Sequence, residues 1–163
     1  MLPPHLRPAS PDDAPRIAEI YNAGIAERSS TLETIPREPS EVLGLLADAE
    51  RFPVLVAYEA AVLGWARLAP YSERPAYAGI GEVSIYVDRE ARGRGIGTSL
   101  LEGLSRGARE LGYWKLTGKL FPENEPSLRL VRRNGWREVG LHLRHGRLDG
   151  RWRDVLVVER LLG

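Results

Sequence analysis

The chain has 163 residues, enough for one domain, and its 43% hydrophobic and 28% charged residues are the composition of a globular protein. Its 23 basic and 22 acidic side chains leave a net charge of +1, which gives no support to nucleic-acid binding, and the lack of cysteine excludes disulfides and thiolate metal sites. No apolar run reaches the roughly 20 residues of a membrane span, and residues 1–7 lack the apolar stretch of a secretory signal, so we expect one soluble domain over residues 1–163, in a bacterial or archaeal cytoplasm.

A short first strand is expected near Leu6, and two helices follow it. Ser10-Pro11-Asp12-Asp13 offers a capping side chain, a proline for the first turn and carboxylates for the positive end of a helix dipole. Apolar residues then recur at helical spacing, which predicts a helix over residues 11–26. Residues 29–39 are polar, contain two prolines and predict a loop, whereas the leucine spacing of residues 40–50 predicts a second helix.

Three β-strands are predicted in the middle of the chain. Residues 53–58 and 62–68 are short β-rich runs separated by the length of a hairpin connection, so we expect an antiparallel pair. Residues 81–88 alternate with the two-residue period of a strand. The two faces of that strand carry Val83, Ile85 and Val87 on one side and Glu82, Ser84 and Tyr86 on the other. Glu82 is thus a carboxylate inside a strand, where carboxylates are uncommon.

The second half of the chain continues with alternating elements. Apolar residues at helical spacing predict a helix over residues 96–111, which Gly112 ends. The remaining predicted elements are a strand over 113–120, a short helix over 126–134, and strands over 136–162 interrupted by a turn around 146–150. The resulting order β, α, α, β, β, β, α, β, α, β, β predicts an α/β fold in which a mixed sheet carries helices on its faces.

The loop at residues 92–98, Arg-Gly-Arg-Gly-Ile-Gly-Thr, is a candidate anion site. Its glycines let the backbone approach a ligand, and the free N–H groups of the following helical turn suit a pyrophosphate. It is neither a Walker loop, which ends in Gly-Lys-Ser/Thr, nor a Rossmann fingerprint after the first strand of the chain. Taken alone, these residues fit a purely structural turn equally well.

Three motifs together carry a family resemblance. The Arg-x-x-Gly-x-Gly sequence of residues 92–97 follows a strand that ends in Val87-Asp88, and Asn124-x-x-Ser127 and Asn134-Gly135-Trp136 come after it. This pattern resembles the GNAT superfamily of N-acetyltransferases, over nearly the whole chain. Within the superfamily, the chain is most similar to the branch of phosphinothricin and methionine sulfone acetyltransferases. That similarity rests on Tyr21-Asn22, PYSERPAY at 70–77, GEVSIYV at 81–87 and GRWRD at 150–154.

The resemblance implies a GNAT fold, in which the central mixed sheet is splayed and acetyl-CoA enters the opening between the fourth and fifth strands. Its pantetheine would lie along Ile85, Tyr86 and Val87. Its pyrophosphate would be held by Arg92, Gly93, Arg94, Gly95, Ile96, Gly97 and Thr98. Asn124 and Ser127 match positions that contact the pantetheine and adenylate end of the cofactor, although a capped helix start at Pro126 explains these two residues as well.

Glu82 is the expected general base. A substrate ammonium with a pKa of about 10 must lose a proton before its nitrogen attacks a thioester, and a carboxylate at the cleft suits that step. A salt-bridged surface glutamate is the alternative interpretation. Many superfamily members carry a tyrosine acid at a position that corresponds here to Val131, which has no proton to give. Tyr77, Tyr86 or a water molecule is then a candidate acid, or none is needed because a thiol with a pKa of about 8.5 is already a fair leaving group.

The resemblance also implies an acceptor, the primary amine of a small amino acid such as phosphinothricin, methionine sulfone or methionine sulfoximine, in a detoxification reaction. Arg74 and Tyr77 match positions beside the acceptor, and an arginine suits a carboxylate because its planar fork pairs both oxygens. The other side of the acceptor pocket is expected at Ser30, Thr31 and Leu32. Residues 147–149 replace the aromatic and basic side chains usual in the branch, which leaves the identity of the acceptor open.

Other interpretations are compatible with the sequence. The acceptor could be a protein N-terminus, a polyamine or an aminoglycoside, or the chain could be a non-catalytic acyl-CoA-binding module, against which Glu82 argues. An arginine-rich nucleic-acid binder is disfavoured by the balanced charge. Relatives in the branch are often homodimers, and exposed late strands such as residues 152–161 would provide the contact. No metal site is predicted, because the histidines are scattered at His5, His142 and His145.

Overall fold

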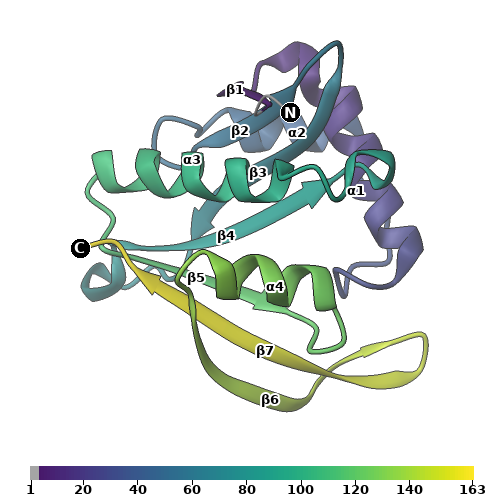
Figure 1. Ribbon diagram of the computed structural model, residues 1–163, viewed down its shortest axis with the longest axis vertical. Coiled ribbons are helices and arrows are strands. Elements are labelled where there is room, and N and C mark those ends of the chain that lie inside the picture. The colour runs from purple at the N-terminus through teal and green to yellow at the C-terminus, as the bar shows by residue number, and fades with distance from the viewer. Residues whose placement is uncertain (1–3) are drawn as a thin grey trace.

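The computed structural model describes residues 4–163 and is built on a seven-stranded mixed sheet with the order β1-β2-β3-β4-β5-β7-β6 (Figure 1). The strands are β1 (His5–Pro8), β2 (Val54–Tyr58), β3 (Val62–Pro70), β4 (Ile80–Val87), β5 (Lys115–Leu120), β6 (Arg137–Leu148) and β7 (Arg151–Leu161). β4 and β5 run parallel, and the other neighbouring strands are antiparallel. The predicted mixed sheet is confirmed. Residues 1–3 lie outside the described residues. They form the first part of residues 1–7, the segment in which we expect no secretory signal.

Helices cover both faces of the sheet (Figure 1). One face carries α1 (Ala14–Glu27), which follows the 3₁₀ turn η1 (Pro11–Asp13), and α2 (Pro39–Leu46). The other face carries α3 (Ile96–Glu110) and α4 (Glu125–Arg133). Two further 3₁₀ turns, η2 (Pro75–Tyr77) and η3 (Arg89–Ala91), stand before and after β4. Across residues 4–163, each helix is too short or too polar to cross a membrane.

The two-residue period of the central strands divides the core into two layers. Leu68 of β3 packs in one cluster with Leu100 and Leu104 of α3. Trp65 of the same strand belongs to a separate cluster with Ile17 and other residues of α1. β4 follows the same rule, since Val83, Ile85 and Val87 pack against the α3 cluster and Tyr86 against the α1 cluster. The two faces predicted for residues 81–88 are therefore confirmed.

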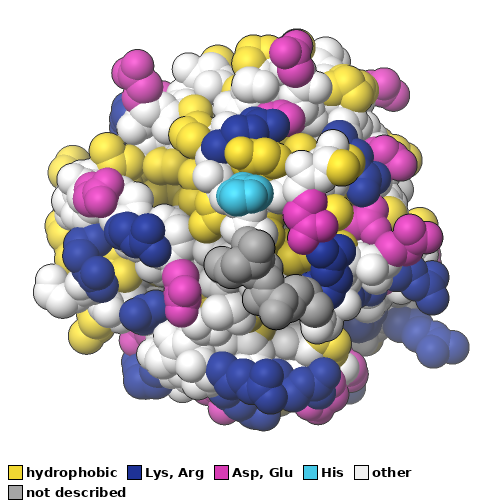
Figure 2. Space-filling model, turned by 45° about the horizontal axis from the view of Figure 1, so that its top comes forward, with side chains coloured by type: hydrophobic (Ala, Val, Ile, Leu, Met, Phe, Trp, Pro, Cys, Tyr) yellow, Lys and Arg dark blue, Asp and Glu magenta, His cyan; other side chains and the backbone are white. Residues whose placement is uncertain are grey.

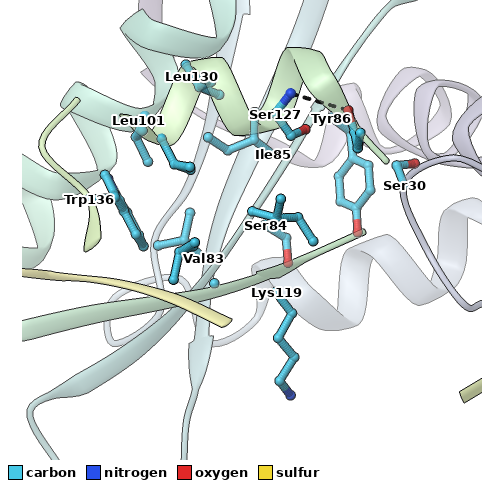
Figure 3. Close-up of a pocket in the computed structure, with 15 residues that line it drawn as sticks. Ser30, Val83, Ser84, Ile85, Tyr86, Leu101, Lys119, Ser127, Leu130 and Trp136 are labelled. Carbon is cyan, nitrogen blue, oxygen red and sulfur yellow. Dashed lines mark hydrogen bonds between the residues drawn. The ribbon is translucent and has the colours of Figure 1, made fainter. Parts of the chain in front are cut away.

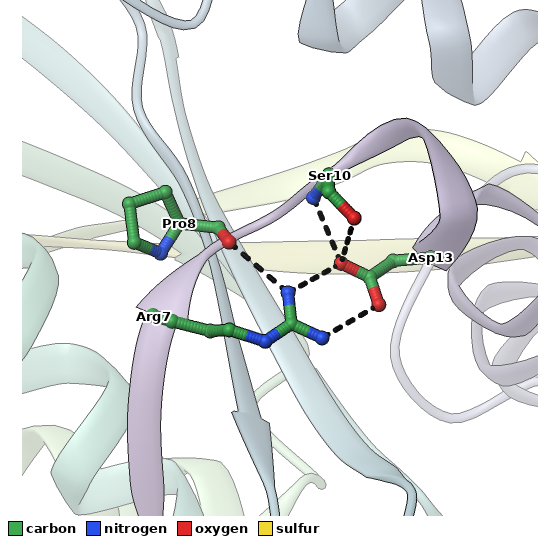
Figure 4. A network of polar contacts seen from close by, with 4 residues as sticks. All are labelled: Arg7, Pro8, Ser10 and Asp13. Atoms are coloured by element: carbon green, nitrogen blue, oxygen red, sulfur yellow. Dashed lines mark hydrogen bonds and ion pairs between the residues drawn. The ribbon is translucent and has the colours of Figure 1, made fainter.

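One buried carboxylate fixes the first strand to the start of α1 (Figure 4). Asp13 accepts hydrogen bonds from Arg7 Nη1 at 2.7 Å, from Arg7 Nη2 at 2.9 Å and from the Ser10 backbone N–H at 2.8 Å. The hydrogen bonds from Arg7 are the main reason that the pKa of Asp13 lies below its ordinary value. The helix start predicted at residues 10–13 is thus present, and the Asp13 carboxylate is its main hydrogen-bond acceptor.

β4 and β5 separate part-way along their length. They pair only at Ile80–Lys115, Gly81–Leu116 and Glu82–Thr117, although β4 continues to Val87 and β5 to Leu120. Beyond Glu82, the β5-facing edge of β4 has no strand partner among residues 4–163. Backbone N–H and C=O groups on such an edge need other hydrogen-bond partners. The predicted opening between the fourth and fifth strands is confirmed.

The last hairpin differs from its sequence prediction. The sequence predicts a turn over residues 146–150, but β6 extends to Leu148, and the turn consists of Asp149 and Gly150. Both turn residues have positive φ, at 52° and 76°, which is the geometry of a two-residue loop that matches the twist of the strands it joins. The glycine at position 146 therefore lies inside a strand, where its missing side chain leaves room for Leu32.

The charged side chains are distributed in small groups over the face shown in Figure 2. Basic and acidic groups alternate across this face, with one larger basic group at its lower edge. Such a mixture accords with the net charge of +1.

Candidate active site

A cleft of about 630 Å³, open to solvent, lies where β4 and β5 separate (Figure 3). The strands line it with Val83, Ser84, Ile85 and Tyr86 from β4 and Gly118, Lys119 and Leu120 from β5. The helices line it with Leu101 of α3 and with Ser127, Leu130 and Val131 of α4. One wall thus offers unpaired strand backbone and the other offers apolar side chains. This combination suits an extended ligand that carries amide groups.

Glu82 lies at the vertex of the opening, because it is the last residue of β4 that pairs with β5. Its side chain is 29% exposed, and its Oε1 lies 3.6 Å from Nζ of Lys119, which lines the cleft. An ion pair of this length and exposure is worth about 1 kcal/mol or less. Glu82 is therefore salt-bridged and adjoins the cleft through Lys119 and Val83, although Glu82 is not itself one of the residues that line it.

Tyr86 joins the cleft to the face covered by α1. Its ring centroid lies 5.0 Å from that of Tyr21, nearly perpendicular to it, and 5.0 Å from that of Trp65. Burial is the main cause that raises the pKa of Tyr86 to about 12. The phenol therefore stays protonated at neutral pH and can donate a hydrogen bond. It is a weak proton donor to a thiolate, whose conjugate thiol has a pKa of about 8.5.

The glycine loop presents free backbone N–H groups at the start of α3. Gly93 and Gly95 have φ of 76° and 77°, in the left-handed region that favours glycine, and Gly95 is the residue that caps α3. Within residues 4–163, no group accepts a hydrogen bond from the N–H groups of 93–98. These donors and the helix dipole make the loop a suitable cradle for a pyrophosphate.

The two arginines of the loop are paired with carboxylates. Arg92 donates to both oxygens of Glu27, at 2.9 and 3.0 Å, and Arg94 donates to Glu59 at 2.6 Å. Both pairs are partly exposed, so each is worth about 1 kcal/mol or less, and a pyrophosphate could compete for the guanidinium groups. The expected role of the Arg92 and Arg94 side chains stays a prediction, whereas the backbone of the loop is already free to bind an anion.

Asn124 both caps a helix and lines the cleft, so the structure does not decide between the capping and cofactor-binding interpretations of this residue. It caps α4, because its Oδ1 accepts a hydrogen bond from the Ser127 N–H at 3.3 Å, and it also lines the cleft together with Ser127. Its Nδ2 donates to the backbone oxygen of Ser29 at 3.2 Å. Asn124 thus ties the start of α4 to the loop that follows α1, across the mouth of the cleft.

An aliphatic side chain occupies position 131, where the family resemblance led us to look for an acid. Val131 lines the cleft, is 8% exposed and belongs to the core cluster that includes Trp136. No hydroxyl or thiol is therefore available from this residue to protonate a leaving group.

Comparison of the chain with known proteins identifies its family. The chain matches the model of the acetyltransferase (GNAT) family over residues 16–136. It belongs to that family. As a GNAT protein it is an N-acetyltransferase that uses acetyl-CoA. The unpaired edge of β4, the apolar helix wall and the free N–H groups at 93–98 fit the pantetheine and pyrophosphate parts of this cofactor.

Several of the similar proteins have names that refer to phosphinothricin or to methionine sulfoximine and sulfone. Phosphinothricin N-acetyltransferase of Streptomyces coelicolor is 35% identical to this chain, over 96% of the chain and 95% of the relative. The L-methionine sulfoximine/L-methionine sulfone acetyltransferase of Pseudomonas aeruginosa is 30% identical, over 94% and 92%. A GNAT superfamily phosphinothricin acetyltransferase of Sinorhizobium meliloti, solved in complex with AcCoA, has a TM-score of 0.93 at 31% identity, covering 99% of this chain and 90% of that one.

The residues predicted on one side of the acceptor are placed differently from one another. Ser30 lines the cleft of this GNAT chain. Thr31 Oγ1 accepts a hydrogen bond from the Glu33 N–H at 3.1 Å. Leu32 packs in a small cluster with Phe121, Leu148 and Val155. Leu32 therefore anchors the loop onto β6 and β7, and only Ser30 of the three reaches the cleft.

Arg74 and Tyr77 belong to the exposed segment between β3 and β4. Arg74 precedes η2, and its backbone N–H donates to Ser72 Oγ at 3.2 Å. Tyr77 is 40% exposed, and its ring lies 5.9 Å from that of Tyr71. Neither residue lines the cleft between β4 and β5, and their roles toward an acceptor stay predictions.

Three cations near the centre were not singled out from the sequence. Lys119 contacts Glu82, and Arg67 faces the side of the sheet to which Glu82 and Tyr86 point. Arg37 lies over the ring of Tyr21, which packs on Tyr86. A signal existed for Arg67, since it is the one charged residue in the apolar run of residues 62–70. The positions of Lys119 and Arg37 depend on contacts between distant segments.

Proposed function

We propose that this GNAT enzyme moves the acetyl group of acetyl-CoA to the primary amine of a small amino-acid-like acceptor, with Glu82 as the general base. The observation that carries the proposal is the place of Glu82 at the vertex where β4 leaves β5. A carboxylate there stands where the two strands begin to separate, next to Val83 and Lys119, which line the cleft. The names of the relatives, which refer to phosphinothricin and to methionine sulfoximine and sulfone, support an amino-acid acceptor.

Glu82 would take the proton that the acceptor ammonium must lose. Bound acetyl-CoA supplies the thioester carbonyl that the free amine attacks. Glu82 accepts the proton directly or through one water, and its Oε1 lies 3.6 Å from Nζ of Lys119. Protonation neutralises the Glu82 carboxylate and removes its ion pair with Lys119. Because that ion pair is worth about 1 kcal/mol or less, Lys119 does not block the proton transfer.

The departing thiolate does not require a strong protein acid. Val131 offers no proton. Tyr86, with a pKa raised to about 12, is a weaker acid than the thiol, so the transfer of its proton to the thiolate is unfavourable. We therefore infer that Tyr86 donates a hydrogen bond and keeps its proton. A thiol of pKa about 8.5 leaves as the anion without full protonation.

The proposal is tested by thiol release from acetyl-CoA. The purified protein is offered phosphinothricin, methionine sulfone, methionine sulfoximine, common amino acids, polyamines and a test peptide. We expect turnover with the amino-acid analogues. Turnover confined to polyamines or the peptide would contradict the acceptor class, and no turnover with any amine, while acetyl-CoA still raises the melting temperature, would contradict catalysis.

We also propose that the enzyme is a homodimer that pairs through its last hairpin. β6 is an edge strand of the sheet, and exposed apolar side chains gather on β6 and β7, with Leu143 72% and Trp152 54% exposed. Such an edge with apolar side chains is a common contact between two copies of one chain. Light scattering behind a size-exclusion column should give twice the monomer mass, and Leu143→Glu should shift the species toward the monomer. A wild-type monomer would refute the proposal.

A further inference from the structure

Arg67 stands one step from Glu82 on the same face of the sheet. It is paired across the strands with Ser84, while its neighbour Ala69 is paired with Glu82. Side chains at positions two apart share a face, so Arg67, Glu82 and Tyr86 point to the side covered by α1 and α2. Cα atoms in such a diagonal relation are about 7–8 Å apart. A molecule whose amine reaches Glu82 can therefore place a second group near Arg67.

The guanidinium of Arg67 has no anionic partner. It is half-buried, and among residues 4–163 no carboxylate lies within 4.0 Å of it and no group accepts a hydrogen bond from it. Two other partly buried arginines are paired, Arg7 with Asp13 and Arg16 with Asp88. Arg37 and Arg160, also partly buried, resemble Arg67 in having no carboxylate within 4.0 Å among residues 4–163. Removing a charge from water without giving it a partner is costly, so a bound anion would stabilise the half-buried guanidinium of Arg67.

A second cation stands near the first. The guanidinium of Arg37 lies 4.3 Å from the centre of the Tyr21 ring, and the residue is held in place by Asn22, which hydrogen-bonds the Arg37 N–H at 2.8 Å and its carbonyl oxygen at 3.0 Å. Burial, and after it the positive charge of Arg37, lower the pKa of Arg67. Two like charges in one partly buried region repel each other, and a bound anion would relieve both the repulsion and the desolvation.

Space for a ligand exists beside Arg67. The residue lines a pocket of about 440 Å³, open to solvent, with Val54 and Pro70 on the strand side and Leu45 and Phe52 on the α2 side. Among residues 4–163, the one carboxylate that lines the same pocket, Asp48, makes its ion pair with Arg51, at 4.0 Å. The charged groups around Arg67 are thus Arg37, Asp48 and Glu82, and none of the carboxylates neutralises it.

We propose that Arg67, assisted by Arg37, binds an acidic group on the side chain of the acceptor. The inference rests on the proposed function and specifies it: the preferred acceptors are amino acids whose side chain ends in a carboxylate, phosphinate or sulfonate, and neutral analogues are poorer. In this arrangement Glu82 receives the amine, and the planar fork of Arg67 pairs two oxygens of the side-chain acid. Arg67 and Arg37 determine specificity and take no part in bond making.

The test compares an anionic acceptor with a neutral one. Wild-type kcat/KM is measured for phosphinothricin, whose side chain carries a phosphinate, and for methionine sulfone, whose side chain is neutral, and then for Arg67→Gln and Arg67→Lys. A hydrogen-bonded charge pair corresponds to a factor of about 10 to 100, so Arg67→Gln should reduce kcat/KM for phosphinothricin by about 10-fold or more beyond its effect on methionine sulfone. Arg67→Lys should recover part of that difference, because it keeps the charge and loses the fork.

Arg106→Gln is the matched control, because Arg106 is an exposed, unpaired arginine on α3, on the opposite face of the sheet, in the part of the chain that the structure describes. Equal losses for both acceptors would assign Arg67 to a group that all amino acids share, and would overturn the side-chain proposal. A wild-type preference for the neutral acceptor would overturn it too.

A binding measurement separates this inference from the acetyl transfer itself. Calorimetric titration with glutarate, a dicarboxylate without an amine, needs no turnover. Binding to the wild-type protein that weakens by about 10-fold in Arg67→Gln would support the anion site even if no amine is acetylated. If amino acids are acetylated but glutarate and phosphinothricin bind equally to wild type and Arg67→Gln, the proposed function stands and the Arg67 site is refuted.

Discussion

The Asp13 carboxylate should contribute to stability in a way that depends on pH. Asp13→Asn removes the negative charge that accepts two hydrogen bonds from Arg7 and one from the Ser10 N–H. Each hydrogen bond to a charged group is worth about 1.5–3 kcal/mol, but the Asn carbonyl keeps one acceptor and Arg7 is 38% exposed, so solvent replaces part of the loss. We expect a destabilisation of about 2 kcal/mol at pH 7, or a fall in Tm of about 4–8 °C.

The sign of the pH effect follows from the lowered pKa of Asp13. Because the folded pKa lies below the unfolded one, the stabilisation is present above the unfolded pKa of about 3.9 and is lost as the pH falls through the folded pKa. Urea unfolding followed by circular dichroism at pH 7 and near pH 3 should therefore show a difference between wild type and Asp13→Asn that shrinks in acid. Asp12→Asn, an exposed neighbour, is the control and should cost about 0.5 kcal/mol or less. Equal effects of the two variants, or a difference that does not change with pH, would refute the reasoning.

Two further predictions concern the cleft. Gly95→Ala places a side chain at φ of 77°, which costs about 1–2 kcal/mol and disturbs the N–H groups at the start of α3. Calorimetry should therefore show weaker binding of acetyl-CoA. An unchanged Kd would contradict the pyrophosphate cradle. Tyr86→Phe should lower kcat by less than about 10-fold, because a phenol of pKa about 12 acts as a hydrogen-bond donor and not as an acid. The alkaline limb of the plot of kcat against pH should stay in place. Loss of that limb would show that Tyr86 is the acid.

Most of the fold follows from local patterns in the sequence. The alternation of residues 81–88 places Glu82 and Tyr86 on one face and the valines on the other because the period of a strand is fixed at two. The helix of residues 96–111 is predicted to within one residue of α3 because its apolar spacing is regular and its ends are glycines. By contrast, the second helix ends at Leu46 rather than at residue 50, since its leucine spacing does not distinguish a helix from the turns that follow.

The contacts of individual charges could not be predicted, because they join distant segments. Arg92 pairs with Glu27 across 65 positions and Arg94 with Glu59 across 35, so the arginines of the loop are not free as the motif alone suggests. Leu32 packs on β6 and β7, which no periodicity in its loop indicates. The isolation of Arg67 depends on the absence of a nearby carboxylate within the described chain, and a sequence does not show absences in three dimensions.

The most direct measurement of the central claim is the pH dependence of kcat for Glu82→Gln. The change keeps the shape of the side chain and removes its ability to accept a proton, so kcat at neutral pH should fall about 100- to 10,000-fold while acetyl-CoA still raises the melting temperature. The variant should recover as the pH approaches the acceptor pKa of about 10, where the free amine no longer needs a base. Glu90→Gln, at an exposed position in η3, should retain full activity. Full activity of Glu82→Gln at neutral pH would contradict the account.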